Sequence, residues 1–280
     1  MEVEILEITA LYAVLVPGTV TGVALLLFPK RLSPLAIAFG YWAGYYAIQG
    51  WPQFPPVEST QWLPWIVVAM ALLGLARLSQ SQNTWRYWLL ALLSLAAAHY
   101  LLLLPAFEYS WGLAEGLGWL SVLVAASLLF WAGFTFNSDR ARPAAVASVL
   151  LIVAGGTAII VGVSGSVILS QLAAVQASTL GAGLIITLWR GKAILKFSEL
   201  LHLVLLSGLI VSSWYFVEVP AVSLAILMTV PWLSLRGSRL VPKGWPAWAY
   251  MLTVITVSLV AVSMACYMAV ISSPPLDVEF

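Results

Sequence analysis

Ionisable side chains are rare within the apolar segments of this sequence, so the few that occur there are the first candidates for chemistry. His99 lies in a strongly apolar stretch, and Glu115 follows it across a short predicted loop. Because connected antiparallel helices pack side by side, these two side chains could meet and then relay a proton or bind a cation. In the structural alternative, His99 bonds to a backbone carbonyl and Glu115 lies at a membrane surface. The sequence leaves both interpretations open.

A second pair, Glu199 and His202, has the Glu-x-x-His spacing that di-iron sites in helical bundles use. Such a site needs a second copy of this motif and two further glutamates, but the chain has two histidines in all. A di-iron centre is therefore excluded, and two histidines expected near opposite membrane faces could not share a haem. With Lys196 nearby, the pattern indicates a ladder of ion pairs at the membrane interface. We expect no metal ion and no cofactor.

The most polar of the apolar segments is Val167–Trp189, whose uncharged side chains suggest a different kind of site. Gln176 lies about ten residues into it, so it would be about 15 Å deep, half of a hydrocarbon core of roughly 30 Å. Together with Gln171, Ser178 and Thr179, it could line a path for a neutral substrate.

The structural alternative for the same segment is a tight hairpin with the glycine-rich segment before it. Small residues let two helices approach closely, and Ser, Thr and Gln can then bond across the contact. This alternative predicts that Gly156 faces the hairpin partner, and that Leu150 lies on roughly the opposite face, where truncation is mild.

Aromatic residues gather around the first loop expected outside. The chain has 14 tryptophans in 280 residues, and amphipathic rings often form a belt at the depth of the lipid headgroups. Alternatively, the helical i, i+4 spacing of several rings could build a platform for a lipid, a quinone or a partner helix. The platform residues would be Tyr41, Trp42, Tyr45, Tyr46 and Trp51.

Membrane-spanning helices must position all of these candidates. Hydrophobic residues make up 62% of the chain and charged residues 8%, whereas a soluble protein carries roughly a quarter charged residues. A span needs about 20 mostly apolar residues. The sequence therefore predicts an all-α, polytopic integral membrane bundle in a single transmembrane domain. The ten expected spans are Ile8–Phe28, Ser33–Gln49, Gln61–Leu78, Trp85–Leu104, Leu113–Phe136, Ala144–Val163, Val167–Trp189, residues 197–217, Pro220–Leu235 and Pro246–Ile271.

The positive charges predict the orientation of this bundle. With ten spans, all twelve Lys and Arg residues fall in or beside alternate loops, which the positive-inside rule assigns to the cytoplasm. Both termini are then on the outer, non-cytoplasmic side of a cell (inner) membrane. The polar patch Asn137–Arg142 is cytoplasmic and separates two five-helix halves, residues 1–138 and 139–280, which would be inverted relative to each other.

Charge and motifs narrow the classes of function. A net charge of +1 provides no basic surface for nucleic acid, and the sequence has no nucleotide-binding or hydrolase motif that would indicate an enzyme. The inverted halves and the polar midplane residues favour a transporter-like permease for a small neutral or amphipathic substrate. Short loops and few interior charges support the alternative, a non-catalytic subunit of a larger membrane complex. The bilayer is the partner in both cases, and other membrane subunits are partners in the alternative.

Overall fold

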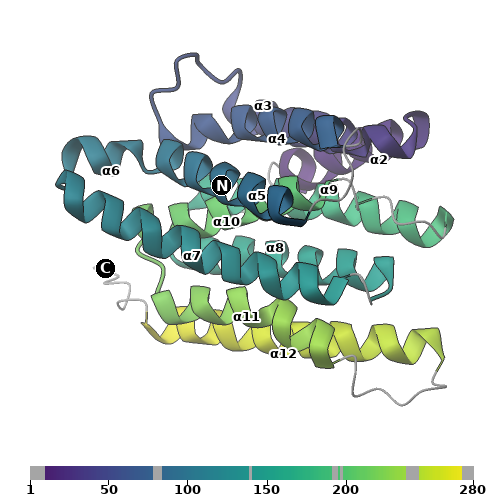
Figure 1. The fold of residues 1–280 in the computed structure, drawn as a ribbon. Helices are drawn as coiled ribbons and strands as arrows, with labels where there is room; N and C mark the ends of the chain where they lie inside the picture. Colours follow the sequence, from purple (N-terminus) through teal and green to yellow (C-terminus); the bar gives the residue numbers. More distant parts are fainter. Residues whose placement is uncertain are drawn as a thin grey trace, which may run out of the picture.

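The structure, a computed structural model, describes residues 10–77, 84–138, 141–190, 195, 198–237 and 246–272. These residues contain helices and no strand (Figure 1). In chain order the helices are η1 (Ala10–Leu15), α2 (Val16–Leu27), η2 (Lys30–Leu32), α3 (Ser33–Gln49), η3 (Ser59–Gln61), α4 (Trp62–Arg77), α5 (Thr84–Leu102), α6 (Leu104–Tyr109), α7 (Leu113–Ser138), α8 (Pro143–Val163), α9 (Val167–Arg190), α10 (Glu199–Phe216), α11 (Ala221–Gly237) and α12 (Ala247–Ser272).

Within the described residues, each expected apolar segment contains one α-helix of at least twelve residues, but two parts of the chain differ from the prediction. The first begins with the π-helical turn η1, and the α-helix proper starts just before Pro17, which is tolerated there because the first helical turn leaves N–H groups unbonded anyway. Residues 105–111, expected to form a loop, begin with the short helix α6. Pro105 lies in the first turn of α6 for the same reason.

Five of the described helices are long and apolar enough to cross a membrane, judged by length and composition. Three further apolar helices are shorter, between ten and seventeen residues. The chain is therefore a helical integral membrane protein with several candidate spans. The five long spans are Leu113–Phe136, Pro143–Val163, Val167–Arg190, Glu199–Phe216 and Trp248–Ser272.

Helix α10 forms the centre of the bundle. Every residue from Leu200 to Ser213 is buried, as expected for a helix that is apolar on all sides. It packs against α4, α5, α7, α8, α9 and α11 (Figure 1). These neighbours come from both halves of the sequence, so the two halves share one core.

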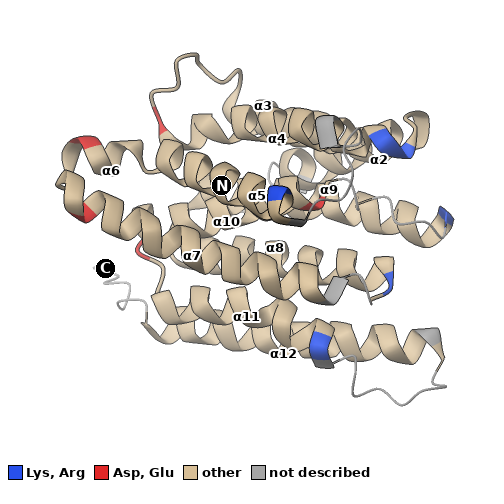
Figure 2. Cartoon of the chain, in the orientation of Figure 1, with Lys and Arg blue, Asp and Glu red and all other residues tan. Residues whose placement is uncertain are grey.

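Charged residues divide the bundle into two ends, visible in Figure 2. We call one the basic end, because the described Lys and Arg residues lie there, and the other the acidic end. Among the residues whose side chains the structure describes, the basic end carries Lys30, Arg31, Arg86, Arg142, Arg190 and Arg236, and the acidic end carries Glu58, Glu108, Glu115 and Glu218. Glu199 is an exception, because it is the first residue of α10, which begins inside the bundle on the side of the basic end.

Small residues allow α2, α3 and α9 to pack closely. A Cβ atom on Gly40 would collide with the Thr21 side chain, and one on Gly44 would lie 2.7 Å from Val175. Gly40 and Gly44 are one helical turn apart on α3, while Thr21 and Val175 belong to α2 and α9. The small-residue spacing in this segment therefore marks a junction of three helices.

The hairpin of α8 and α9 forms, but two of its residues are not where the sequence suggested. Ser170 on α9 donates a hydrogen bond to the carbonyl of Ala158 on α8, 2.8 Å away. Gly156, however, faces α12, because a Cβ atom there would lie 2.5 Å from Val262. The expected mild position, Leu150, is fully buried in the core, since α8 has neighbours on several sides.

The pair of glycines in α8 provides a matched test of this packing. We expect Gly156→Ala to destabilise the protein by about 1–3 kcal/mol, because the stiff Val262 side chain cannot yield. Gly155→Ala is the control, since no atom lies within 4 Å of a Cβ there. This substitution should stabilise the protein by about 0.5–1 kcal/mol, because alanine has the higher helix propensity. Thermal unfolding in detergent measures both, and equal melting temperatures would contradict the assigned contact.

Candidate functional site

A glutamine and a histidine meet in the middle of the bundle. Gln176 on α9 and His202 on α10 are both fully buried, and Gln176 Nε2 lies 2.7 Å from His202 Nδ1. A glutamine amide nitrogen can only donate, so Nδ1 accepts, and the proton of the neutral imidazole is on Nε2. The residue favoured for the substrate path thus lies in the interior, with a partner that was not expected.

His202 is deep in the protein because α10 begins inside the bundle. Leu195, just before α10, packs against Gly183, where an added Cβ would lie 2.6 Å from its side chain. Gly183 is seven residues before the end of α9 at Arg190, so α10 starts about 10 Å further in than α9 ends. The interfacial ladder expected for Glu199 and His202 is therefore wrong for His202.

The remaining polar atoms of the pair define what this site could bind. Gln176 Oε1 and His202 Nε2 are buried without a hydrogen-bond partner. Gln176 Oε1 is an acceptor and the protonated His202 Nε2 is a donor, and both atoms belong to uncharged groups. A buried polar atom without a partner costs roughly 1–3 kcal/mol. The arrangement is therefore complementary to a small neutral molecule that both donates and accepts.

The other residues of the predicted substrate path have different surroundings. Gln171 is buried on α9 and has an interaction of its own. Thr179 is also buried, and its hydroxyl donates to the carbonyl of Gln176 in the same helix, 2.8 Å away. Ser178 is half-buried and donates to the carbonyl of Val14 in η1. Gln176 pairs with a side chain of another helix, that of His202 on α10.

His99 is also fully buried, but both of its ring nitrogens have partners. Nδ1 donates to the Leu95 carbonyl at 2.6 Å, and Nε2 lies 3.0 Å from the Ser127 hydroxyl on α7, which donates to it. Glu115, by contrast, is exposed. The structure does not bring His99 and Glu115 together, and it gives His99 the local bonding that the structural alternative describes.

The expected aromatic platform is divided between two faces of α3. Tyr41 and Tyr45 point into the core and are almost completely buried, whereas Tyr46 and Trp51 are exposed. Trp42 lies between, donates from Nε1 to the Pro64 carbonyl at 3.0 Å, and packs edge-on against Trp51. The five rings therefore do not form one continuous surface.

Sequence reasoning missed the role of His202, although a signal for it was present. The segment that follows Glu199 is apolar on every side, and a helix of this kind is enclosed by protein. A histidine in such a segment needs a buried polar partner. Gln176 could have been proposed as this partner, because it is an uncharged polar residue in the preceding span, the most polar one of the chain.

Comparisons with protein-family models, with curated proteins and with solved structures found no match in any of the three. Among the described residues, no group of three His, Cys, Asp or Glu side chains could hold a metal ion. The class defined by the structure is thus a helical membrane protein with a neutral polar pair in its core.

The two histidines should be distinguishable by their tautomers. In nitrogen-15 NMR spectra of histidine-labelled protein in detergent, we expect one Nδ1–H ring, His99, and one Nε2–H ring, His202, because each tautomer follows from its hydrogen bonds. Gln176→Leu should shift only the signals of His202, and Ser127→Ala only those of His99. Two rings of the same tautomer would contradict this assignment.

Proposed function

We propose that the protein is a multi-pass permease for a small neutral solute, which binds transiently to Gln176 and His202. The observation that carries this proposal is the pair of buried, unbonded polar atoms, Gln176 Oε1 and His202 Nε2, at the contact of α9 and α10. A hydroxyl or amide of a passing solute would satisfy both atoms. An uncharged pair of this kind favours neutral solutes, because burying an ion costs far more free energy than burying an uncharged polar group.

The polar pair in the core helps to choose between the two functions that the sequence leaves open, a permease and a non-catalytic subunit of a larger complex. A non-catalytic subunit needs no polar pair at its centre, where two unsatisfied atoms lower stability without benefit. A permeation site needs such atoms, because the solute must exchange its bonds with water for bonds with the protein. The pair therefore supports the permease over the subunit, which becomes one outcome of the test below.

For the topology we propose ten spans, with both termini outside and the basic end in the cytoplasm. The separation of charge in Figure 2 supports this orientation through the positive-inside rule. It requires that α2, α3, α4, α5 and α11 cross the bilayer in addition to the five long helices. The halves, residues 1–138 and 139–280, would then be inverted relative to each other.

Cysteine labelling in intact cells tests the orientation. In a Cys266→Ala background, Val57→Cys should react with a membrane-impermeant maleimide, because Val57 is exposed at the acidic end. Ser138→Cys, at the last residue of α7, should react only after the cells are permeabilised. Labelling of Ser138→Cys in intact cells would reverse the proposed orientation.

Osmotic reswelling of proteoliposomes tests permeation, with glycerol and urea as the neutral probes. The purified chain should speed reswelling over empty liposomes, and Gln176→Leu should slow it about five- to tenfold, the equivalent of one lost hydrogen bond. The control is Ser207→Ala, because this buried hydroxyl bonds only within α10, to the Val204 carbonyl.

Two results would contradict the permease. One is reswelling with both probes at the rate of empty liposomes. The other is co-purification of a stoichiometric membrane partner without which the chain is unstable, since that result would favour the subunit of a larger complex.

A further inference from the structure

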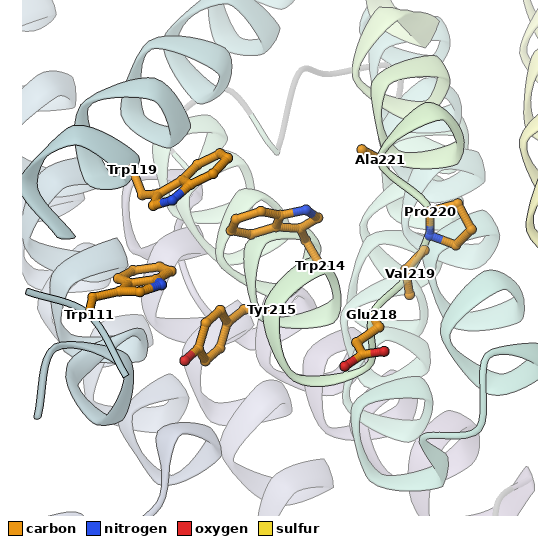
Figure 3. Close-up of a pocket in the computed structure, with 8 residues that line it drawn as sticks. All are labelled: Trp111, Trp119, Trp214, Tyr215, Glu218, Val219, Pro220 and Ala221. Carbon is orange, nitrogen blue, oxygen red and sulfur yellow. The ribbon is translucent and has the colours of Figure 1, made fainter. Parts of the chain in front are cut away.

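A pocket opens at the acidic end, where the ends of α7, α10 and α11 meet. It has a volume of about 490 Å³ and lies apart from the buried pair, since neither Gln176 nor His202 lines it. Figure 3 shows its lining residues, which are Trp111, Trp119, Trp214, Tyr215, Glu218, Val219, Pro220 and Ala221.

Four aromatic rings form one side of this pocket. The rings of Trp119 and Trp214 have centroids 5.0 Å apart and are tilted by 46°, and those of Trp111 and Tyr215 are 4.9 Å apart at 71°. Tilted and edge-on arrangements of this kind are favourable for aromatic pairs and stabilise the ring positions. In Figure 3 the rings of Trp111 and Trp119 lie at one side, Glu218 lies at the other, and Trp214 and Tyr215 lie between them. The pocket thus combines electron-rich ring faces with one carboxylate.

The backbone conformation of Glu218 is unusual. Its φ is +57°, and it is the one non-glycine residue with positive φ among the described parts of the chain. This region normally favours glycine, and it persists at non-glycine positions where surrounding contacts impose it, often at binding sites. Here the turn is closed by the Val219 N–H, which donates to the Ser213 carbonyl at 3.3 Å. The turn places an exposed carboxylate at the pocket edge.

The charges around the pocket favour a cation. The described Lys and Arg side chains all lie at the basic end, on the far side of the bundle (Figure 2). A carboxylate near aromatic faces attracts positive charge, and the attraction is largest for a cation that is weakly hydrated and wide enough to touch several rings. A quaternary ammonium group meets both conditions, whereas a metal ion would need more oxygen ligands than Glu218 offers.

We propose that this pocket binds a quaternary ammonium group, with Trp111, Trp119, Trp214 and Tyr215 around its methyl groups and Glu218 opposite its charge. The group could come from a free cation such as choline, or from the headgroup of a choline lipid. The site is separate from the buried pair and does not depend on the permease.

Calorimetry on the purified full chain in dodecyl maltoside, a detergent without a choline group, tests the charge requirement. Choline and tetramethylammonium should bind, while 3,3-dimethylbutan-1-ol, the uncharged analogue of choline, should bind at least about tenfold more weakly. Equal binding of the uncharged alcohol, or no binding of either cation, would overturn the proposal.

Matched variants test which residues hold the cation. Glu218→Gln and Trp214→Leu should each weaken tetramethylammonium binding, by roughly 3- to 30-fold. Their controls are Glu108→Gln and Trp51→Leu, which alter an exposed carboxylate and an exposed ring outside the pocket. Gel filtration verifies that each variant is folded. Equal losses in the test and control variants would overturn the assignment to this pocket.

Nanodiscs of defined composition distinguish the two sources of the cation. If the headgroup of a lipid is the ligand, tetramethylammonium should bind in phosphatidylglycerol discs and lose affinity in phosphatidylcholine discs. If a free cation is the ligand, its affinity should be the same in both. Either result supports the pocket, and failure to bind in phosphatidylglycerol discs contradicts it.

Discussion

A helix that is enclosed by protein on every side must satisfy its polar groups within the protein, and α10 is in that position. From Leu200 to Ser213 it has no face toward lipid or water. The hydroxyls of Ser207 and Ser213 donate to backbone carbonyls three residues earlier in α10. They therefore need no partner on a neighbouring helix. The ring of His202 instead accepts a hydrogen bond from Gln176 on α9. The enclosure of α10 thus decides how six helices pack around it, and it leaves two of its side chains, His202 and Ser212, each with a buried polar atom that has no partner.

The two histidines differ in how their ring nitrogens are bonded, although both lie in the same apolar core. His99 has both nitrogens bonded, one within α5 and one to α7, so it joins two helices and has no capacity left. His202 has one nitrogen bonded and one without a partner. The difference lies in the facing helix, because α7 offers a hydroxyl to His99, while the amide of Gln176 engages only one side of the other ring. Binding capacity depends here on the neighbour more than on the residue type.

The sequence predicted the helices well, since long apolar runs and their loops can be recognised locally. It also singled out Gln176 correctly as an interior residue. Which faces of the helices meet was less accessible, because that depends on neighbours distant in the chain. Gly156 faces α12 rather than α9, and Leu150 is buried although periodicity placed it away from the hairpin. The enclosed start of α10 also depends on the packing of Leu195 against Gly183, which no local pattern encodes.

The close packing of α2 and α3 against α9 has a consequence for biosynthesis. The Ser178 hydroxyl bonds to the carbonyl of Val14, 164 residues earlier in the chain. At roughly 5–20 residues per second, α2 and α3 would wait on the order of ten to thirty seconds for α9 to emerge from the ribosome. During this interval Gly40 and Gly44 have neighbours only within the first helices or among lipids. The hairpin of α2 and α3 must therefore persist in the membrane as an insertion intermediate. Until α9 arrives, the face that will contact α9 is accessible to factors that assist membrane assembly.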